Sequence, residues 1–310
     1  MLTAEIALCH ALSPIAPISA LPPQLQQAVD KGLLVQPRPN IYVLGTVHIG
    51  SESAKEVSLL LDAVRPQTVV VEVSPSRVQL IRRRNKSKVK GVKQGRSLQD
   101  TSSNQLQVAF ASLPALAQRG WSTGGLGGLV FSTTIIWGSL LRRSLTANEE
   151  AVVLPRTDEF AAAIEAADAI GATVVASDIE IDQLMGAVAR SMTPRDWVSL
   201  GINIAKETVG LHEVDPVHRR RNESLIDWEE RRRNRATARA SKKHGDQTAP
   251  CLSRALVDDR DDRFAESCLR ILQLSEDIIY EAAEGKGGGN IIVCVVGLVH
   301  LDGVIQRLKN

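Results

Sequence analysis

Three continuous apolar runs place the strongest constraint on the fold of this chain. They lie at residues 41–45 (IYVLG), 67–73 (QTVVVEV) and 291–297 (IIVCVVG). Apolar runs without polar alternation are typical of parallel strands buried on both faces. Between the first two, apolar residues recur at helical spacing over 57–64, and Pro66 ends the pattern. Strand, helix and strand in this order form a βαβ unit, so we predict an α/β domain.

A second helix and strand follow in TDEFAAAIEAADAIGATVVASD, where Gly171 separates an Ala-rich helical pattern from a short strand. Helical periodicity returns over 261–285 and leads into the last apolar run. We predict a single α/β domain with a central, largely parallel or mixed sheet flanked by helices, and with a helical, charged insertion. In the first helix, Ser51 or Ser53 is the expected N-cap.

The N-terminal residues 1–39 lack the signals of a targeting sequence. They are apolar, but they contain Glu5 and no Lys or Arg before Lys31. A signal peptide needs a basic start, and a transit peptide is usually rich in Arg. We therefore expect a loosely structured leader over 1–39 and the folded domain over 40–310.

Charge is unevenly distributed along the chain. The net charge of +2 is close to balance and argues against a dedicated nucleic-acid binder. Residues 82–96 are rich in Lys and Arg without an acid, which predicts a solvated loop or contact with phosphate, anionic lipid or an acidic partner. Residues 213–250 are dense in Arg and Glu, and we expect an exposed helix that frays into a loop.

Residues 121–141 carry no charged side chain over 21 positions, enough to span a bilayer. Because Gly, Ser and Thr interrupt this stretch, we favour a buried or membrane-surface helix over a span. The four cysteines, at 9, 251, 268 and 294, show no CxxC spacing. They are typical of reduced thiols in a cytosolic or organellar protein.

The first and last apolar runs leave their strands through the same motif, GxxH. It reads GTVH from Gly45 to His48 and GLVH from Gly297 to His300. Ligands of α/β sheets bind where strands end, and histidine can hold a metal or act as a base. If the two strands are neighbours, both histidines meet at one edge of the sheet. The alternative for each is a buried, hydrogen-bonded structural role.

Glu72, inside VVVEVSP, is the carboxylate that most needs a partner, since burying an unpaired charge is costly. An ion pair with Arg77 would be structural, whereas a place beside His48 would make Glu72 a metal ligand or general base. Arg260 could be its counter-ion or an oxyanion clamp. Alternatively, Arg260 belongs to a solvated helix start whose aspartates, within 258–261, serve the helix N-terminus.

Other catalytic patterns are missing from the sequence. There is no GxGxxG or GxxxxGK[ST] phosphate loop, no HExxH and no GxSxG. His212 and His218 lie in polar sequence and are expected at the surface.

Four segments together resemble the TraB/PrgY family: GTVHIGSESAKEV, RPQTVVVEVSPSR, VDDRDDRF and VVGLVHLDGV. That family is related to the TIKI metalloproteases and, more remotely, to erythromycin esterase and ChaN-like proteins. The resemblance covers about residues 40–310 and implies one α/β domain with a site built from both GxxH motifs, a Glu and an Arg. Carried onto this sequence, the family positions are Gly45, His48, Glu72, Arg77, Glu159, Arg260, Gly297 and His300.

The resemblance implies a metal-dependent hydrolase of peptides or related amides, because TIKI relatives cleave peptides and bacterial relatives shut down a peptide pheromone. His48, His300 and Glu72 would hold Zn, Mn or Co, and Glu72 could also act as the base. Arg260 would stabilise developing negative charge. The expected partner is a peptide or protein substrate.

One departure from the family pattern supports an alternative. Relatives read like GDRPI after the central strand, whereas this chain reads SDIEI, so Ile179 stands where an Arg is expected. The alternative is a non-catalytic adaptor or tether that binds an organelle membrane or one of its proteins. The expected location is the cytoplasm or an organelle, such as the mitochondrial outer membrane or a plastid, without secretion. Tetrapyrrole binding, as in ChaN-like proteins, is a third alternative.

Overall fold

The structure is a computed structural model with an α/β architecture. It describes residues 17–47, 51–89, 159–208, 215–218, 223–281 and 290–310, with 118, 121–122, 124–125 and 127–129. The strands among these residues are β1 (Leu34–Arg38), β2 (Ile41–Thr46), β3 (Thr68–Val71), β4 (Thr173–Ala176) and β5 (Ile292–Gly297). They form one sheet in the order β1-β2-β5-β3-β4, in which β2, β5, β3 and β4 are parallel and β1 is antiparallel to β2. The predicted fold class is confirmed.

Helices make up most of the remaining described chain. Before β4 they are η1 (Ile18–Ala20), α1 (Pro23–Asp30), α2 (Glu52–Val64), α3 (Pro75–Val89) and α5 (Glu159–Ile170). After β4 they are α6 (Ile181–Ser191), α7 (Pro194–Thr208), α8 (Leu225–Arg232), α9 (Arg235–Thr248), α10 (Pro250–Ser253), the π-helical turn η2 (Arg254–Asp258), α11 (Asp259–Glu281) and α12 (Leu301–Lys309).

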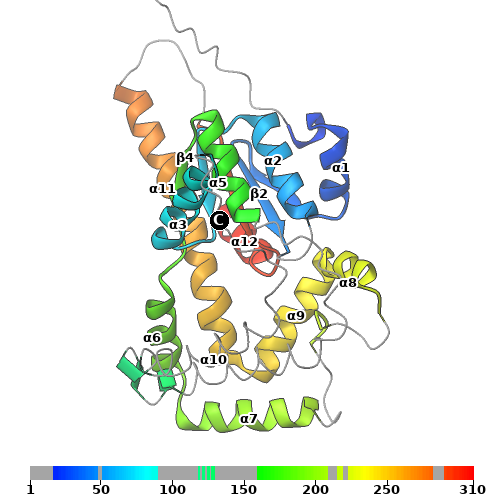
Figure 1. The fold of residues 1–310 in the computed structure, drawn as a ribbon, viewed down its shortest axis with the longest axis vertical. Coiled ribbons are helices and arrows are strands. Elements are labelled where there is room, and N and C mark those ends of the chain that lie inside the picture. Colours follow the sequence, from blue (N-terminus) through cyan, green and yellow to red (C-terminus); the bar gives the residue numbers. More distant parts are fainter. Residues whose placement is uncertain are drawn as a thin grey trace, which may run out of the picture.

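The direction of the crossovers assigns helices to the two faces of the sheet. The connections from β2 to β3 and from β3 to β4 run the same way across it, so right-handed crossovers put α2 and α5 on one face. The return to β5 runs the opposite way and puts α11 on the other face. In agreement, α2 packs against α5 and α11 packs against α12 (Figure 1).

The central strands are buried over their whole length because helices cover both faces. Every residue of β2, β3 and β5 is buried. The predicted apolar stripe of α11 also enters this core, with Phe264, Cys268 and Leu272 buried and Ile271 packed beside them. The aliphatic runs that suggested parallel strands are therefore the centre of the hydrophobic core.

The two GxxH strands are direct neighbours, as predicted. Gly45 of β2 lies opposite Val296 of β5, and Thr46 lies opposite Gly297. Both strands therefore end at the same edge of the sheet, where their loops lead into α2 and α12. This carboxyl edge, where β2, β5, β3 and β4 all end, is where ligands of such sheets bind.

Helices α6, α7, α9 and α10 gather at one end of the molecule, away from most of the sheet, and α11 runs between the two parts (Figure 1). A small separate apolar cluster holds this end together, made of Met185, Val188, Met192 and Ala255. Gly124 and Gly127 lie against Ala189 of α6, so the described start of the uncharged 121–141 stretch packs there. None of the helices described is both long and apolar enough to cross a membrane.

The expectation of a loosely structured leader was wrong for residues 17–39. These residues form η1, α1 and β1, and β1 pairs with β2. Leu25, Ala28, Leu33 and Leu34 are buried in the main core. Their apolar side chains cover the outer part of the sheet beside β2. Residues 1–16 lie outside the described part.

Two further expectations need correction. The basic run 82–96 is helical up to Val89, where α3 ends, and the remainder lies outside the described residues. Within the charged segment, the described residues 223–248 do not fray: α8 and α9 are regular helices, capped by Ser224 and Asn234. Side chain to backbone hydrogen bonds at the starts of α8 and α9 contribute to this order, and charge patterning alone does not reveal them. Ser53 is not the cap of α2; its hydroxyl accepts a hydrogen bond from the N–H of Val47.

Gly45 is required by close packing and not by a turn, because it lies within β2. A Cβ at this position would lie 2.7 Å from Leu298 and 3.1 Å from Leu301, which flank the second GxxH loop. We predict that Gly45→Ala lowers the free energy of unfolding by about 1–3 kcal/mol, as overpacking does. Denaturant unfolding measures the change.

Gly201→Ala is the matched control. Gly201 lies inside α7 with open space around the position of a Cβ. Alanine there should be neutral or stabilising by up to about 1 kcal/mol. Equal effects of the two substitutions would contradict the proposed packing role of Gly45.

Candidate functional site

Glu72, Arg260 and His300 meet at the carboxyl edge of the sheet, as the sequence predicted. Glu72 follows the last residue of β3, and its backbone N–H still donates to the carbonyl of Val295 in β5. Its Oε1 lies 2.5 Å from Nη2 of Arg260 and 3.3 Å from Nε2 of His300. Residues separated by more than two hundred positions therefore form one polar cluster.

Arg260 enters from the first turn of α11 and is held by two carboxylates. Its Nε donates to Oδ1 of Asp178 at 3.0 Å, and its Nη2 donates to Oδ2 at 2.8 Å. The same Nη2 donates to Glu72, and Nη1 donates to the carbonyl of Leu256 at 3.0 Å in η2. A planar guanidinium can satisfy this fork, whereas a lysine could not.

His300, just before α12, uses both ring nitrogens. Nδ1 lies 2.7 Å from Oδ1 of Asp261, and Nε2 faces Glu72 and Nη1 of Arg260, the latter at 3.3 Å. The Phe264 ring stands nearly perpendicular to the imidazole, with centroids 5.2 Å apart. The carboxylate of Asp261 thus fixes the ring orientation and directs Nε2 toward Glu72.

The second GxxH motif also supplies a backbone donor. The N–H of Gly297 donates to Oε2 of Glu72, while Oε1 is paired with Arg260. Both oxygens of this buried carboxylate are therefore satisfied. The counter-ion of Glu72 is Arg260, which replaces the predicted structural pairing with Arg77.

The pKa values follow from burial opposed by mutual attraction. Burial would raise the pKa of Glu72, but His300, Arg260 and the N–H of Gly297 lower it to about 2. Burial would lower the pKa of His300, but Glu72 and Asp261 raise it to about 9. Burial raises the pKa of Asp261 against the influence of His300. At neutral pH this arrangement favours an imidazolium paired with an ionised Glu72.

Gly303 allows Asp261 to approach His300. A Cβ at Gly303 would lie 1.9 Å from Oδ2 of Asp261 and 2.7 Å from its Cγ, so any side chain would displace the carboxylate. Gly303 is in the first turn of α12. The sequence VHLDG therefore carries both the histidine and the gap that its partner occupies.

The remaining predicted residues are not part of the cluster of Glu72, Arg260 and His300 in the described structure. His48 lies outside the described residues, so its meeting with His300 stays a prediction. Arg77 lies over the ring of Phe160, 5.7 Å from its centroid, and Glu159 is buried at the first residue of α5. His218 is exposed, as expected, and His212 lies outside the described residues.

Sequence reasoning missed Asp178 and Asp261 as site residues. Asp178 comes two residues after the end of β4. Because ligands bind at the carboxyl ends of parallel strands, a polar residue so close to the end of a predicted strand could have been recognised as a candidate. Asp261 was assigned to the helix N-terminus, but it is 2% exposed and bound to His300. Nothing in DDRDDR distinguishes it from its exposed neighbours.

Glu72 and His300 suit a divalent ion in donor type and separation. A tetrahedral ion with bonds of about 2.0–2.1 Å sets neighbouring ligand atoms about 3.3–3.4 Å apart. The separation of Oε1 and Nε2 is 3.3 Å. Asp261 on the far ring nitrogen is the usual second partner of a metal-bound histidine. Metal binding would require Arg260 to leave both atoms.

A complete set of three ligands is not present in the described part of the chain. No group of three His, Cys, Asp or Glu side chains there has the arrangement of a metal site. The third predicted ligand, His48, is outside it.

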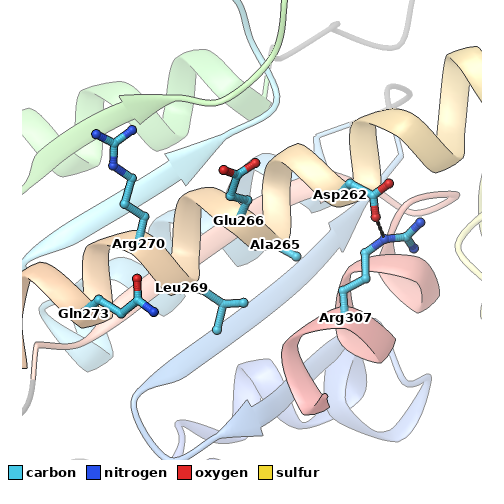
Figure 2. A pocket seen from close by; sticks show the side chains of 7 residues that line it. All are labelled: Asp262, Ala265, Glu266, Leu269, Arg270, Gln273 and Arg307. Atoms are coloured by element: carbon cyan, nitrogen blue, oxygen red, sulfur yellow. Dashed lines mark hydrogen bonds and ion pairs between the residues drawn. The ribbon is translucent and has the colours of Figure 1, made fainter.

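An open depression of about 510 Å³ lies elsewhere, on the outer faces of α11 and α12. Figure 2 shows Glu266 and Arg270 projecting from α11, and Asp262 paired with Arg307 of α12. None of the site residues lines this depression. The site itself is nearly closed, with Glu72 8% and His300 2% exposed.

Models of known protein families and curated protein sequences give no match to this chain. The resemblance to the TraB/PrgY family therefore depends on the four sequence segments that carry it.

We predict that Asp261→Asn lowers the pKa of His300 from about 9 toward its ordinary 6.5, because the hydrogen bond that His300 Nδ1–H donates to the Asp261 carboxylate raises this pKa. Imidazole NMR titration measures the shift. Asp262→Asn is the control, since Asp262 is exposed and pairs with Arg307. An unchanged His300 pKa in Asp261→Asn would contradict the assigned role.

Stability should also depend on pH through His300. Its folded pKa of about 9 lies above the ordinary 6.5, so its contribution is complete below pH 6.5 and is lost as the pH rises through 9. A shift of this size corresponds to stability on the order of 3 kcal/mol. Denaturant unfolding in chelator, from pH 6 to 10, should show this loss in the wild type and a weaker one in His300→Asn. Equal slopes would refute the ion pair.

Proposed function

We propose that this chain is a metal-dependent hydrolase of the kind that the TraB/PrgY resemblance implies, acting on a peptide or related amide bond. One observation carries the proposal: Nε2 of His300 and Oε1 of Glu72 lie 3.3 Å apart, while Asp261 holds the other ring nitrogen. This arrangement presents two suitable ligand atoms within a buried cluster of charged side chains.

His300, Glu72 and His48 would hold the ion, which would make a bound water more acidic and polarise the scissile carbonyl. Glu72 is ionised at neutral pH, with a pKa of about 2, so it offers a charged oxygen as ligand. His300 must release its Nε2 proton to bind, and therefore metal affinity should rise with pH. Asp261 keeps the imidazole oriented during this exchange.

Arg260 would be the group that stabilises negative charge developing on the substrate. Nε and Nη2 of Arg260 each donate a hydrogen bond to Asp178. Arg260 can therefore release Glu72 and remain anchored at the site through Asp178. A guanidinium held there can donate to a carbonyl oxygen on which negative charge develops. Asp178 would be the positioning residue for this donor.

The SDIEI segment favours one alternative, a non-catalytic adaptor or tether at an organelle membrane. Ile179 has no cation to offer, and its N–H donates to Asp178. The adjacent Glu180 accepts hydrogen bonds from Ser76 at the start of α3. In this alternative, Arg260 remains in contact with Glu72 and His300, and the cluster only stabilises the fold.

We predict that purified wild-type chain, incubated with Zn, Mn or Co and desalted, retains metal and cleaves members of a peptide library. Glu72→Gln and the double variant His48→Ala/His300→Ala should each lose roughly 100-fold or more in metal affinity and activity, since even indirect partners of a metal contribute roughly 10–100-fold. Elemental analysis and mass spectrometry of the library measure both.

His218→Ala is the matched control, because His218 is exposed and far from the cluster in the chain. It should keep metal and activity. Equal and low metal content in the wild type and the double variant, without cleavage, would reject the hydrolase. Flotation of the wild type with liposomes would then test the tether.

A further inference from the structure

The site cannot receive a ligand in the observed arrangement. His300 is 2% exposed and Glu72 is 8% exposed, and the side chain of Arg260 is 13% exposed. Access at the carboxyl edge therefore needs movement of an element near it. An element docked mainly by polar contacts is easier to displace than one held by a packed apolar face.

Toward α2, α11 and α12 the segment from α8 to α9 is docked in that way, while α9 also packs against α7 and α10, and Trp228 of α8 is buried. Ala238 is the buried residue of α9, and the helix has Arg and Lys along one side. Arg235 donates through Nε to Oδ1 of Asp302 at 2.7 Å, and Arg239 donates to the same atom through Nη2 at 3.0 Å. Asp302 is two residues after His300, in the first turn of α12.

The same segment is tied to the other two helices that begin at this edge. Lys242 of α9 lies 3.2 Å from Asp258, two residues before Arg260. Arg233, between α8 and α9, lies 2.5 Å from Glu56 of α2, the helix that follows the first GxxH motif. Ion pairs thus join the segment to α12, to the start of α11 and to α2.

We infer that residues 223–248 form a strap that closes the carboxyl edge of the sheet and opens by release of its ion pairs with Glu56, Asp258 and Asp302. The strap governs access to the cluster whatever the site binds, so it does not depend on the proposed hydrolase. It gives the charged insertion a role that its sequence alone did not suggest.

The buried guanidinium of Arg233 destabilises the closed position of the strap. The residue is 4% exposed, and among the described residues no acceptor faces its buried Nε and Nη1. An unsatisfied buried donor destabilises the state that buries it, and water would satisfy it in the open state. The ion pairs of Arg235 and Lys242, which hold the strap closed, are partly exposed, so each is weak and is screened by salt, whereas the Arg233–Glu56 pair is buried. The strap is therefore poised to move.

Hydrogen exchange of the full chain tests the strap. The double variant Arg235→Gln/Arg239→Gln should raise exchange in α9 and in the amides of 298–301 by about 2- to 30-fold, which is what two exposed ion pairs contribute. Raising NaCl from about 0.05 to about 0.5 M screens ion pairs more strongly. Hydrogen exchange of the wild type in α9 and 298–301 should therefore also increase. Lys55→Gln is the control, since Lys55 pairs with Glu52 on its own helix.

Exchange in β5 distinguishes strap opening from global loss of structure. It should stay unchanged in the double variant. If β5 also accelerates, the milder Arg239→Gln, whose side chain is 61% exposed, and the wild-type salt series decide. Unchanged exchange in α9 would show that the ion pairs do not hold it. Faster α9 with unchanged 298–301 would show that α9 does not cover the edge. Either result overturns the proposal.

Discussion

The guanidinium of Arg260 is the interaction on which the carboxyl edge depends. Glu72 follows directly from a strand that is buried on both faces, where an unpaired carboxylate would be strongly unfavourable. Arg260 supplies the compensating charge from α11, and Asp178 fixes it from the end of β4. One side chain thereby links the ends of two strands to a helix on the opposite face from α2 and α5. Removing it would take one of two cationic partners from Glu72, which would keep His300, and the guanidinium from Asp178, and loss of a partner is the costly case for buried ion pairs.

The histidine depends on the same electrostatics. His300 lies between Glu72 and Asp261, and these two carboxylates explain why its pKa rises to about 9 although burial opposes its charge. In the absence of metal, both cations of the cluster are thus paired with carboxylates, and the cluster is closed. A divalent ion would compete with Arg260 for Glu72 and with a proton for His300. The proposed hydrolase and the proposed tether differ only in whether this exchange takes place.

Much of this arrangement was predictable from particular residues. Uninterrupted apolar runs identified the parallel strands, and two equal GxxH exits predicted neighbouring strands, which β2 and β5 are. Glu72 stood out because a buried strand does not tolerate a lone charge. Asp261 did not stand out, since its burial depends on the gap at Gly303 in a helix forty residues further on. The leader and the charged segment were misjudged because their docking uses tertiary contacts, pairing with β2 and ion pairs to Glu56, Asp258 and Asp302, which local patterns do not contain.

We propose that Glu72 and His300 are metal ligands, and that Arg260 contacts both side chains in the metal-free state. Anomalous diffraction from crystals soaked in Mn²⁺ tests it most directly. We expect an anomalous peak within bonding distance of Nε2 of His300 and an oxygen of Glu72, with Arg260 withdrawn from Glu72 but still paired with Asp178. Crystals without a peak at saturating Mn²⁺, Zn²⁺ and Co²⁺, and with Arg260 still paired with Glu72, would contradict it.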